Sequence, residues 1–462
     1  MKKVKESASH SSVLEWNGTP SLKEAFPLAV QHVVAMVVGC ITPAILVANT
    51  VNLSPEDETL LVQSALIIAA IATALQLFPL FGRIGAGLPI IMGVSFAYVP
   101  TLLAIGGEFG IATILGAQIC GGAAAVIVGI FIKYLRPLFP PLVAGTVVFT
   151  IGLSLYPVAI KYMAGGAGSE NFGSPLNWGI ALLTLAAVVF FNYFTKGFCK
   201  LASILFGLLV GYIVCIPLGL VNFQSVGEAG WFQFPQPLHF GIEFQGSAIA
   251  SMVIMYVVNS VQAIGDMSST TGGAMDRVPT DKELSGGIIG NGVSSIVGAL
   301  FGGLPTATFS QNVGIVIVTR VINRFVLGLA ALIILIAGLI PKFSALLTTI
   351  PQCVLGGATI MVFASITMTG IKLILTAGLT PRNSTAVGLA VAIGVGISSV
   401  AGSIAGPGMP GWVNDIFGSS SVIISTIIVI IFNLVLPKDP APISESSETG
   451  SEETEKESAV KK

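Results

Sequence analysis

Two titratable side chains lie inside long apolar stretches of the chain. Asp266 is in the segment SVQAIGDM and His32 is in LAVQHVVAM, whereas the other acidic residues and histidines fall in the terminal segments or between apolar runs. Ionisable groups at membrane depth are costly and mark functional sites, and Asp and His are well suited to carry or sense a proton. The structural alternatives are a helix-end cap for Asp266 and a hydrogen bond between helices for His32.

Side-chain amides lie close to these residues in the sequence pattern. Gln262 precedes Asp266 by four residues, so both side chains share one face of a helix. Gln311 and Asn312 begin another apolar stretch, where a helix N-terminus offers free backbone N–H groups. Amides both donate and accept hydrogen bonds. The pattern therefore suits a flat, neutral or weakly anionic heterocycle with alternating N–H and C=O groups.

The composition indicates that membrane-spanning helices position these residues. Of 462 residues, 53% are hydrophobic and 9% are charged, whereas an ordinary soluble domain carries about 25% charged residues. Too few polar residues are present to cover a water-soluble surface of this size. We expect an all-α polytopic protein in a lipid bilayer, with no nucleic-acid partner, no metal and no cofactor.

Fourteen apolar ranges approach the roughly 20 residues that cross a bilayer as a helix. With a cytoplasmic N-terminus, every lysine and arginine except Lys161 and Lys342 falls on the cytoplasmic side. This bias predicts a multi-pass protein of the cytoplasmic membrane with both termini inside, and a disordered Ser/Glu-rich tail at 438–462. The ranges are 27–48, 60–80, 87–104, 110–132, 140–160, 178–195, 201–220, 247–266, 285–302, 309–320, 325–340, 351–371, 383–403 and 419–436.

The third and tenth ranges, 87–104 and 309–320, are short, and each adjoins a stretch typical of a short β-strand. Interrupted segments at matching positions predict an inverted repeat of seven plus seven spans, with a binding site between the broken helices. The range 87–104 contains Phe96, and the range 309–320 begins with Phe309. Either aromatic ring could stack on a flat ligand or simply pack in the core. The predicted parts are an N-terminal tail (1–25), two repeats (26–222 and 223–437) and the tail 438–462.

Four short motifs stand in order along the chain. They are Gln31-His32, Ser95-Phe96-Ala97, the run from Gln262 to Asp266, and the run from Gln311-Asn312 through Gly314 to Thr319-Arg320. They resemble, respectively, the first-helix pair, the third-span binding stretch, the eighth-span element and the signature motif of the nucleobase–ascorbate transporter family. The resemblance covers nearly the whole chain except the tails.

The resemblance implies an elevator-type transporter. A core domain (about 26–135 and 247–342) would move against a gate domain (about 138–222 and 350–437), and members are often homodimeric proton or sodium symporters. Asp266 and His32 would couple protonation to movement. The substrate would lie between the third and tenth spans, bound by Gln311, Gln262, Phe96, Ser95, Phe309, Ser310 and Asn312.

The first residue of the signature motif informs the substrate. Gln311 resembles the purine carriers, whereas Glu is typical of uracil permeases and Pro of ascorbate carriers, so the resemblance implies xanthine or uric acid. Gln262 and Asn291 are amides where members usually carry carboxylates. An amide would not repel an anionic purine, but the change leaves proton coupling, sodium coupling and no coupling open.

Other classes of function remain as alternatives. Uracil or another pyrimidine is a second substrate class, and a sulfate-type anion transporter is a third possibility, because that fold is similar. The chain contains no Walker A, HExxH or GxSxG motif, so the sequence argues against an enzyme.

Overall fold

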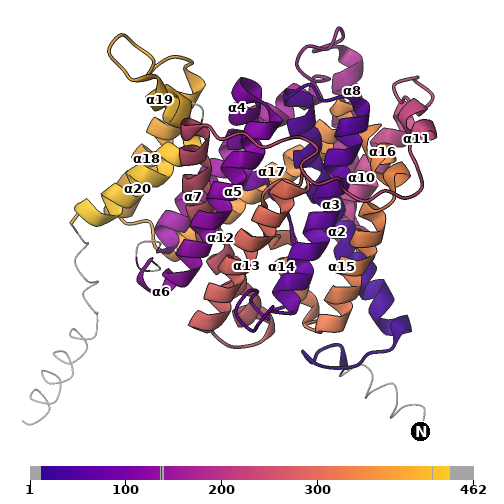
Figure 1. Cartoon of the computed structure of the whole chain (residues 1–462), viewed down its shortest axis with the longest axis horizontal. Helices are drawn as coiled ribbons and strands as arrows, with labels where there is room; N and C mark the ends of the chain where they lie inside the picture. Colours follow the sequence, from indigo (N-terminus) through magenta and orange to yellow (C-terminus); the bar gives the residue numbers. More distant parts are fainter. Residues whose placement is uncertain (1–11, 136, 138–139, 419, 438–462) are drawn as a thin grey trace, which may run out of the picture.

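Long helices contain most of the residues in the computed structural model, which describes residues 12–135, 137, 140–418 and 420–437 (Figure 1). The predicted disordered tail, 438–462, lies outside the described residues. The first helices are α2 (Leu22–Thr50), α3 (Pro55–Leu77), a 3₁₀ turn η1 (Phe96–Tyr98), α4 (Val99–Phe109), α5 (Ile111–Ile130), α6 (Ile132–Leu135), α7 (Pro141–Met163), α8 (Pro175–Phe194), α9 (Phe198–Leu201), α10 (Ser203–Cys215) and α11 (Gln224–Glu228). They are followed by α12 (Gly246–Ala274), α13 (Asp281–Leu300), α14 (Ser310–Thr319), α15 (Arg324–Gly338), α16 (Pro341–Thr348), α17 (Gln352–Thr376), α18 (Pro381–Ser399), α19 (Gly411–Val413), a π-helical turn η3 (Asn414–Gly418) and α20 (Ser421–Val435).

Each of the fourteen predicted ranges overlaps a helix of the structure. In the described part of the chain, seven helices are long and apolar enough to cross a membrane: α2, α3, α5, α7, α8, α12 and α17. Two further apolar pairs are sharply bent, α15 with α16 by 81° and the α19–η3 segment with α20 by 89°. The segments 96–109, 203–215 and 310–319 are apolar but shorter.

Several helices begin at a Ser-Pro or Thr-Pro pair. The hydroxyls of Ser54, Ser174 and Thr380 each accept a hydrogen bond from the backbone N–H three residues later, and a proline follows each of them. The hydroxyl satisfies an otherwise unpaired N–H, while proline adopts the helical φ and lacks an N–H of its own. Local sequence therefore fixes where α3, α8 and α18 begin.

The predicted short strands are confirmed. Strand β1 (Met92–Val94) pairs with β2 (Thr306–Thr308) in antiparallel register, with Gly93 opposite Ala307. Each strand leads directly into a helical segment, β1 into η1 and α4, and β2 into α14. The pair therefore places two helix beginnings, far apart in sequence, next to each other.

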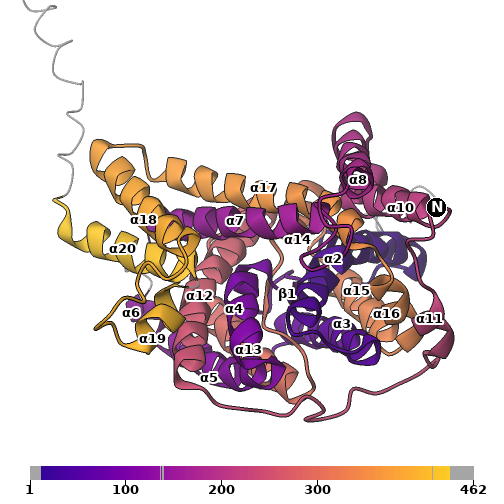
Figure 2. The ribbon, with the colours of Figure 1, turned by 90° about the horizontal axis from the view of Figure 1, so that it is seen from above.

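The helices form two groups, which are visible from above (Figure 2). Helices α7, α17, α18, α20, α8 and α10 lie along one side, while α2, α3, α4, α5, α12, α13 and α15 form the other group. Close packing relies on glycine: a Cβ at Gly145 of α7 would lie 2.7 Å from the backbone nitrogen of Ile374, and one at Gly370 of α17 would lie 2.3 Å from that of Phe149. Such contacts let helix backbones approach closely without a hydrophobic driving force from water.

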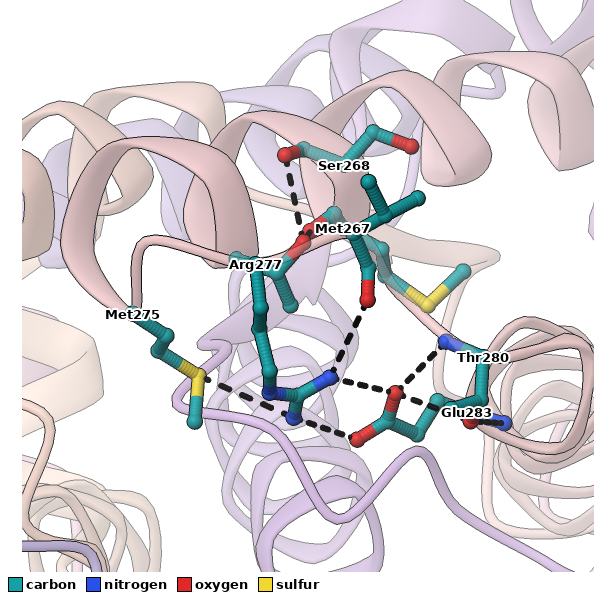
Figure 3. A network of polar contacts seen from close by, with 8 residues as sticks. Met267, Ser268, Met275, Arg277, Thr280 and Glu283 are labelled. Atoms are coloured by element: carbon teal, nitrogen blue, oxygen red, sulfur yellow. Dashed lines mark hydrogen bonds and ion pairs between the residues drawn. The ribbon is translucent and has the colours of Figure 1, made fainter.

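A polar network closes the loop between α12 and α13 (Figure 3). The guanidinium of Arg277 donates to both carboxylate oxygens of Glu283, at 2.9 and 2.6 Å, and this hydrogen bonding raises the pKa of Arg277 above its ordinary value. Glu283 also accepts from the backbone N–H and hydroxyl of Thr280, at 2.8 and 2.9 Å. Thr280 in turn accepts from the Glu283 N–H, which completes a capping box at the start of α13.

We expect Glu283→Ala to lower the free energy of unfolding by about 1 kcal/mol, because it removes the reciprocal half of the cap and the partner of Arg277. Glu283→Gln keeps an acceptor for Thr280 and should lose less. Thermal unfolding of the detergent-purified protein measures both. Equal melting temperatures for the wild type and Glu283→Ala would show that the network adds no stability.

Candidate functional site

The candidate site is built around the ends of β1 and β2. Ser95 follows β1 and accepts a hydrogen bond from the backbone N–H of Ala97 at 3.1 Å, which starts the η1 turn. Phe309 follows β2 and stands at the N-cap of α14, where Ser310 is the first helical residue. Two segments therefore begin side by side, and helix beginnings expose N–H groups and a positive dipole end. The arrangement can bind carbonyl or anionic groups of a ligand.

Each strand is followed by a strand-to-helix junction, Ser95 after β1 and Phe309 after β2. Asp266 holds the second of these junctions in place. Its carboxylate accepts a hydrogen bond from the hydroxyl of Thr308, the last residue of β2, and a 2.8 Å bond from the hydroxyl of Ser310. The sequence placed Asp266 at the inner end of a span, but α12 continues for about two further turns to Ala274. Asp266 is therefore an interior residue of a long helix whose side chain contacts the beginning of α14.

The two predicted amides nearest to this carboxylate lie on accessible surface. Gln311 is exposed in the first turn of α14, and Gln262 is half-buried on α12, four residues before Asp266. Nothing lies within 4 Å of the position that a Cβ would take at Gly265 or Gly314. One side of α12 and one side of α14 therefore leave open space beside both amides.

His32 and Asn312 form a separate, buried contact. The amide nitrogen of Asn312 lies 3.2 Å from Nδ1 of His32 and donates to the His32 carbonyl oxygen at 3.1 Å. Both side chains are 1% exposed. This contact joins α2 to α14, so the structure shows the interhelical hydrogen bond that the sequence had left as the alternative for His32.

Phe96 and Phe309 lie together in the core beside the strands. A Cβ at Gly39 of α2 would lie 3.6 Å from the Phe309 ring and 3.9 Å from the Phe96 ring. Phe96 also makes an edge contact with Phe363 of α17, with ring centroids 5.1 Å apart. Both phenylalanines are buried, so in this conformation the two rings pack against protein beside the junctions.

The remaining predicted residues support the frame of the site. Asn291 of α13 accepts a 2.9 Å hydrogen bond from the hydroxyl of Thr306, which fixes the start of β2. Arg320 ends α14 and forms an ion pair with Asp276 at 2.8 Å, while Thr319 donates to a backbone oxygen within α14. Gln31 is half-buried on α2.

Thr306 and Thr308 are the supporting residues that the sequence reasoning did not single out. They alternate in the polar run TATFSQN, which includes the stretch beside range 309–320 that is typical of a short β-strand. Two threonines spaced by two residues in a strand point to the same side of it. That spacing was the available signal that both hydroxyls would face neighbouring polar groups.

The fold is similar to that of solved transporter membrane domains. The transmembrane domain of the cyanobacterial bicarbonate transporter BicA matches with a TM-score of 0.58 at 16% identity, covering 89% of this chain and 97% of that one. The anion transporter SLC26A9 matches with a TM-score of 0.56 at 12% identity, covering 90% of this chain and 65% of the other. The chain therefore shares the fold of these membrane domains.

Sequence comparison shows the family to which the chain belongs. A family model described as "Permease family" matches residues 23–403. Three relatives are the uric acid permease PucJ and the xanthine permease of Bacillus subtilis and the xanthine permease XanQ of Escherichia coli. In that order, their sequences are 37%, 36% and 32% identical to this chain. The alignments span 83%, 81% and 84% of this chain and 86%, 85% and 86% of the respective relatives. The chain belongs to this permease family, the nucleobase–ascorbate transporters, and is a transporter rather than an enzyme.

Proposed function

We propose that this protein imports a purine nucleobase, xanthine or uric acid, across the cytoplasmic membrane. The observation that carries the proposal is the exposed amide of Gln311 at the beginning of α14, beside the half-buried Gln262. The names of the relatives, which include xanthine and uric acid permeases, support the same substrate class. An oxidised purine presents alternating N–H and C=O groups, which two side-chain amides can pair with.

Residues of both junctions would bind the substrate. Gln311 and Gln262 pair with the edge of the base, and backbone groups around Ser95, Phe96 and Ser310 complete the hydrogen bonds. Phe309 and Phe96 close the site from the side of α2, since both rings lie near Gly39. Asn312 acts through its contact with His32, which fixes the rotation of α14 and so directs Gln311 toward the open side.

Asp266 would link a proton to the position of α14. An ionised carboxylate accepts hydrogen bonds only, and here it accepts from Thr308 and Ser310. A protonated carboxyl group must itself donate, so one of these hydroxyls would have to turn or leave. His32, through Asn312, would sense the same movement. We propose proton symport on this basis, with sodium coupling and uncoupled transport as the alternatives.

The architecture in this proposal has fourteen spans in a seven-plus-seven inverted repeat, with both termini in the cytoplasm. The antiparallel pairing of β1 with β2, each followed by a short helical segment, supports the repeat. The two groups of helices in Figure 2 support a core (26–135 and 247–342) and a gate (138–222 and 350–437) that move as an elevator. A homodimer in the bilayer completes the proposal.

Uptake of radiolabelled xanthine and uric acid tests the function. Cells that lack their own purine permeases should accumulate at least one of them when they express this protein, and a proton uncoupler should abolish that accumulation. Competition with excess unlabelled uracil separates purine from pyrimidine transport. Accumulation that survives the uncoupler but requires Na⁺ would replace proton with sodium coupling, and the absence of uptake of either purine would contradict the assignment.

A further inference from the structure

A small cavity lies away from the proposed substrate site, at the other end of α12. Its lining comes from α4, from the first two turns of α12, from Asp415 and Ile416 of η3, and from Ser420 before α20. Among its lining residues are the carboxylates Glu108 and Asp415 and the hydroxyl residues Thr101, Ser247 and Ser420. The cavity is just large enough for one particle the size of a water molecule.

Three buried hydroxyls at this cavity lack partners. Thr101 and Ser420 are 2% exposed and Ser247 is 9% exposed, and none of their hydroxyl oxygens has a hydrogen-bond partner in the described structure. A buried hydroxyl without a partner is costly, and such groups are normally satisfied by protein, water or a bound ion. Ser420 stands at the N-cap of α20 yet does not cap that helix. Three orphan hydroxyls around one small space therefore indicate a missing ligand.

The charges around the cavity favour a cation. Glu108 and Asp415 interact with each other electrostatically, and among the described residues neither makes a hydrogen bond or an ion pair. Among the described residues, no lysine, arginine or histidine lines the cavity. The beginnings of α12 and α20 each contribute about half a positive charge and the end of α4 about half a negative charge, so the two carboxylates leave a net negative charge at the cavity.

We propose that this cavity binds a hard monovalent cation of the size of Na⁺, held by the two carboxylates and the three hydroxyls. Hydroxyl and carboxylate oxygens are ligands for hard cations, and no soft ligand is present among the residues that line the cavity. The site is distinct from the substrate site at Asp266 and Gln311, which lies near the opposite half of α12.

The location gives the bound cation a mechanical role. Glu108, Thr101 and Ser247 lie on α4 and α12, in the proposed core, whereas Asp415 and Ser420 lie in the proposed gate. In Figure 2 the α19–α20 region lies beside α12 and α4. An ion that binds residues of both groups stabilises the relative position of core and gate that the structure shows. This role rests on the proposed core and gate.

Thermal unfolding of the purified full-length protein tests the site without any substrate. In NaCl, compared with choline chloride at equal ionic strength, the melting temperature should rise with the logarithm of the salt concentration, because the ion binds only the folded state. Glu108→Gln and Asp415→Asn should abolish the rise. Glu170→Gln, which changes an exposed carboxylate in another loop, should retain it.

Thr101→Val removes one hydroxyl while preserving shape and should shift the response to several-fold higher NaCl. If the carboxylate variants do not purify as monodisperse protein, the sodium response of Thr101→Val tests the cation site in their place. Equal melting temperatures in sodium and choline, or a sodium response that survives all three cavity variants, would overturn the site. A response to CaCl₂ but not to NaCl would overturn the assignment of a monovalent ion.

Discussion

Replacing Gln311 with alanine is expected to reduce uptake of xanthine or uric acid at low substrate concentration by about ten- to a hundredfold. A polar group of the bound purine that loses its hydrogen-bond partner lowers the binding free energy by about 1–3 kcal/mol. The side chain is exposed and has no hydrogen-bond partner in the described structure, so its removal breaks nothing within the protein. The loss should therefore appear as a raised KM with an unchanged amount of protein in the membrane. Initial uptake rates across a range of substrate concentrations measure it.

Two variants separate binding from folding in this experiment. Gln224→Ala removes an amide from the exposed helix α11 and should transport like the wild type. Asn312→Ala removes the buried contact with His32 and should lower the amount of folded protein as well as uptake. Normal uptake by Gln311→Ala would contradict a substrate-binding role for this residue and, with it, the reading of the signature motif as a purine site.

The positions of the helices could be predicted because lipid leaves few alternatives. Backbone N–H and C=O groups in a bilayer must be satisfied within the segment, so a long apolar run of this kind forms a helix. The end of α12 was harder to predict, since the residues after Asp266 are small and polar and read as a loop. Thr270 and Thr271 instead donate to the carbonyl oxygens of Asp266 and Met267, four residues earlier, and so satisfy their hydroxyls inside the helix.

The arrangement of the site was only partly predictable. The motifs identified the residues, but adjacent residues on a helix point about 100° apart, and sequence alone does not give the rotation of α14. The structure turns Asn312 toward His32 and leaves Gln311 exposed, so the two amides of one motif have different surroundings. The hydroxyls of Thr308 and Ser310 likewise meet Asp266 only because β1 and β2 pair in one register.

The small cavity between α4, α12 and α20 had no signal in the sequence. Thr101, Ser247 and Ser420 are common residue types in three distant segments, and each alone reads as a helix-end hydroxyl. Their shared feature is a three-dimensional one, namely that all three are buried around one space without partners. Unsatisfied groups become visible only when every neighbouring donor and acceptor is placed.

Asp266→Asn is expected to reduce uncoupler-sensitive accumulation of the purine to the background of cells without the protein, because it removes the group proposed to bind the coupling proton. Asparagine keeps one acceptor oxygen for Thr308 or Ser310 but cannot take up or release a proton. Accumulation against a gradient needs the proton, whereas exchange of labelled for unlabelled substrate at equilibrium needs no net proton movement. Exchange should therefore persist when accumulation is lost.

The matched variant for this experiment is Ser310→Ala, which removes one hydrogen bond to the carboxylate but leaves the carboxylate itself. If Asp266 only positions α14, both variants should reduce accumulation and exchange in the same proportion, since each weakens the same junction. If Asp266 carries the coupling proton, only Asp266→Asn should separate the two activities. Accumulation by Asp266→Asn that still collapses with an uncoupler would exclude Asp266 as the proton carrier. The coupling proton would then have to bind a group other than Asp266, and His32 is buried against Asn312 rather than at the substrate site.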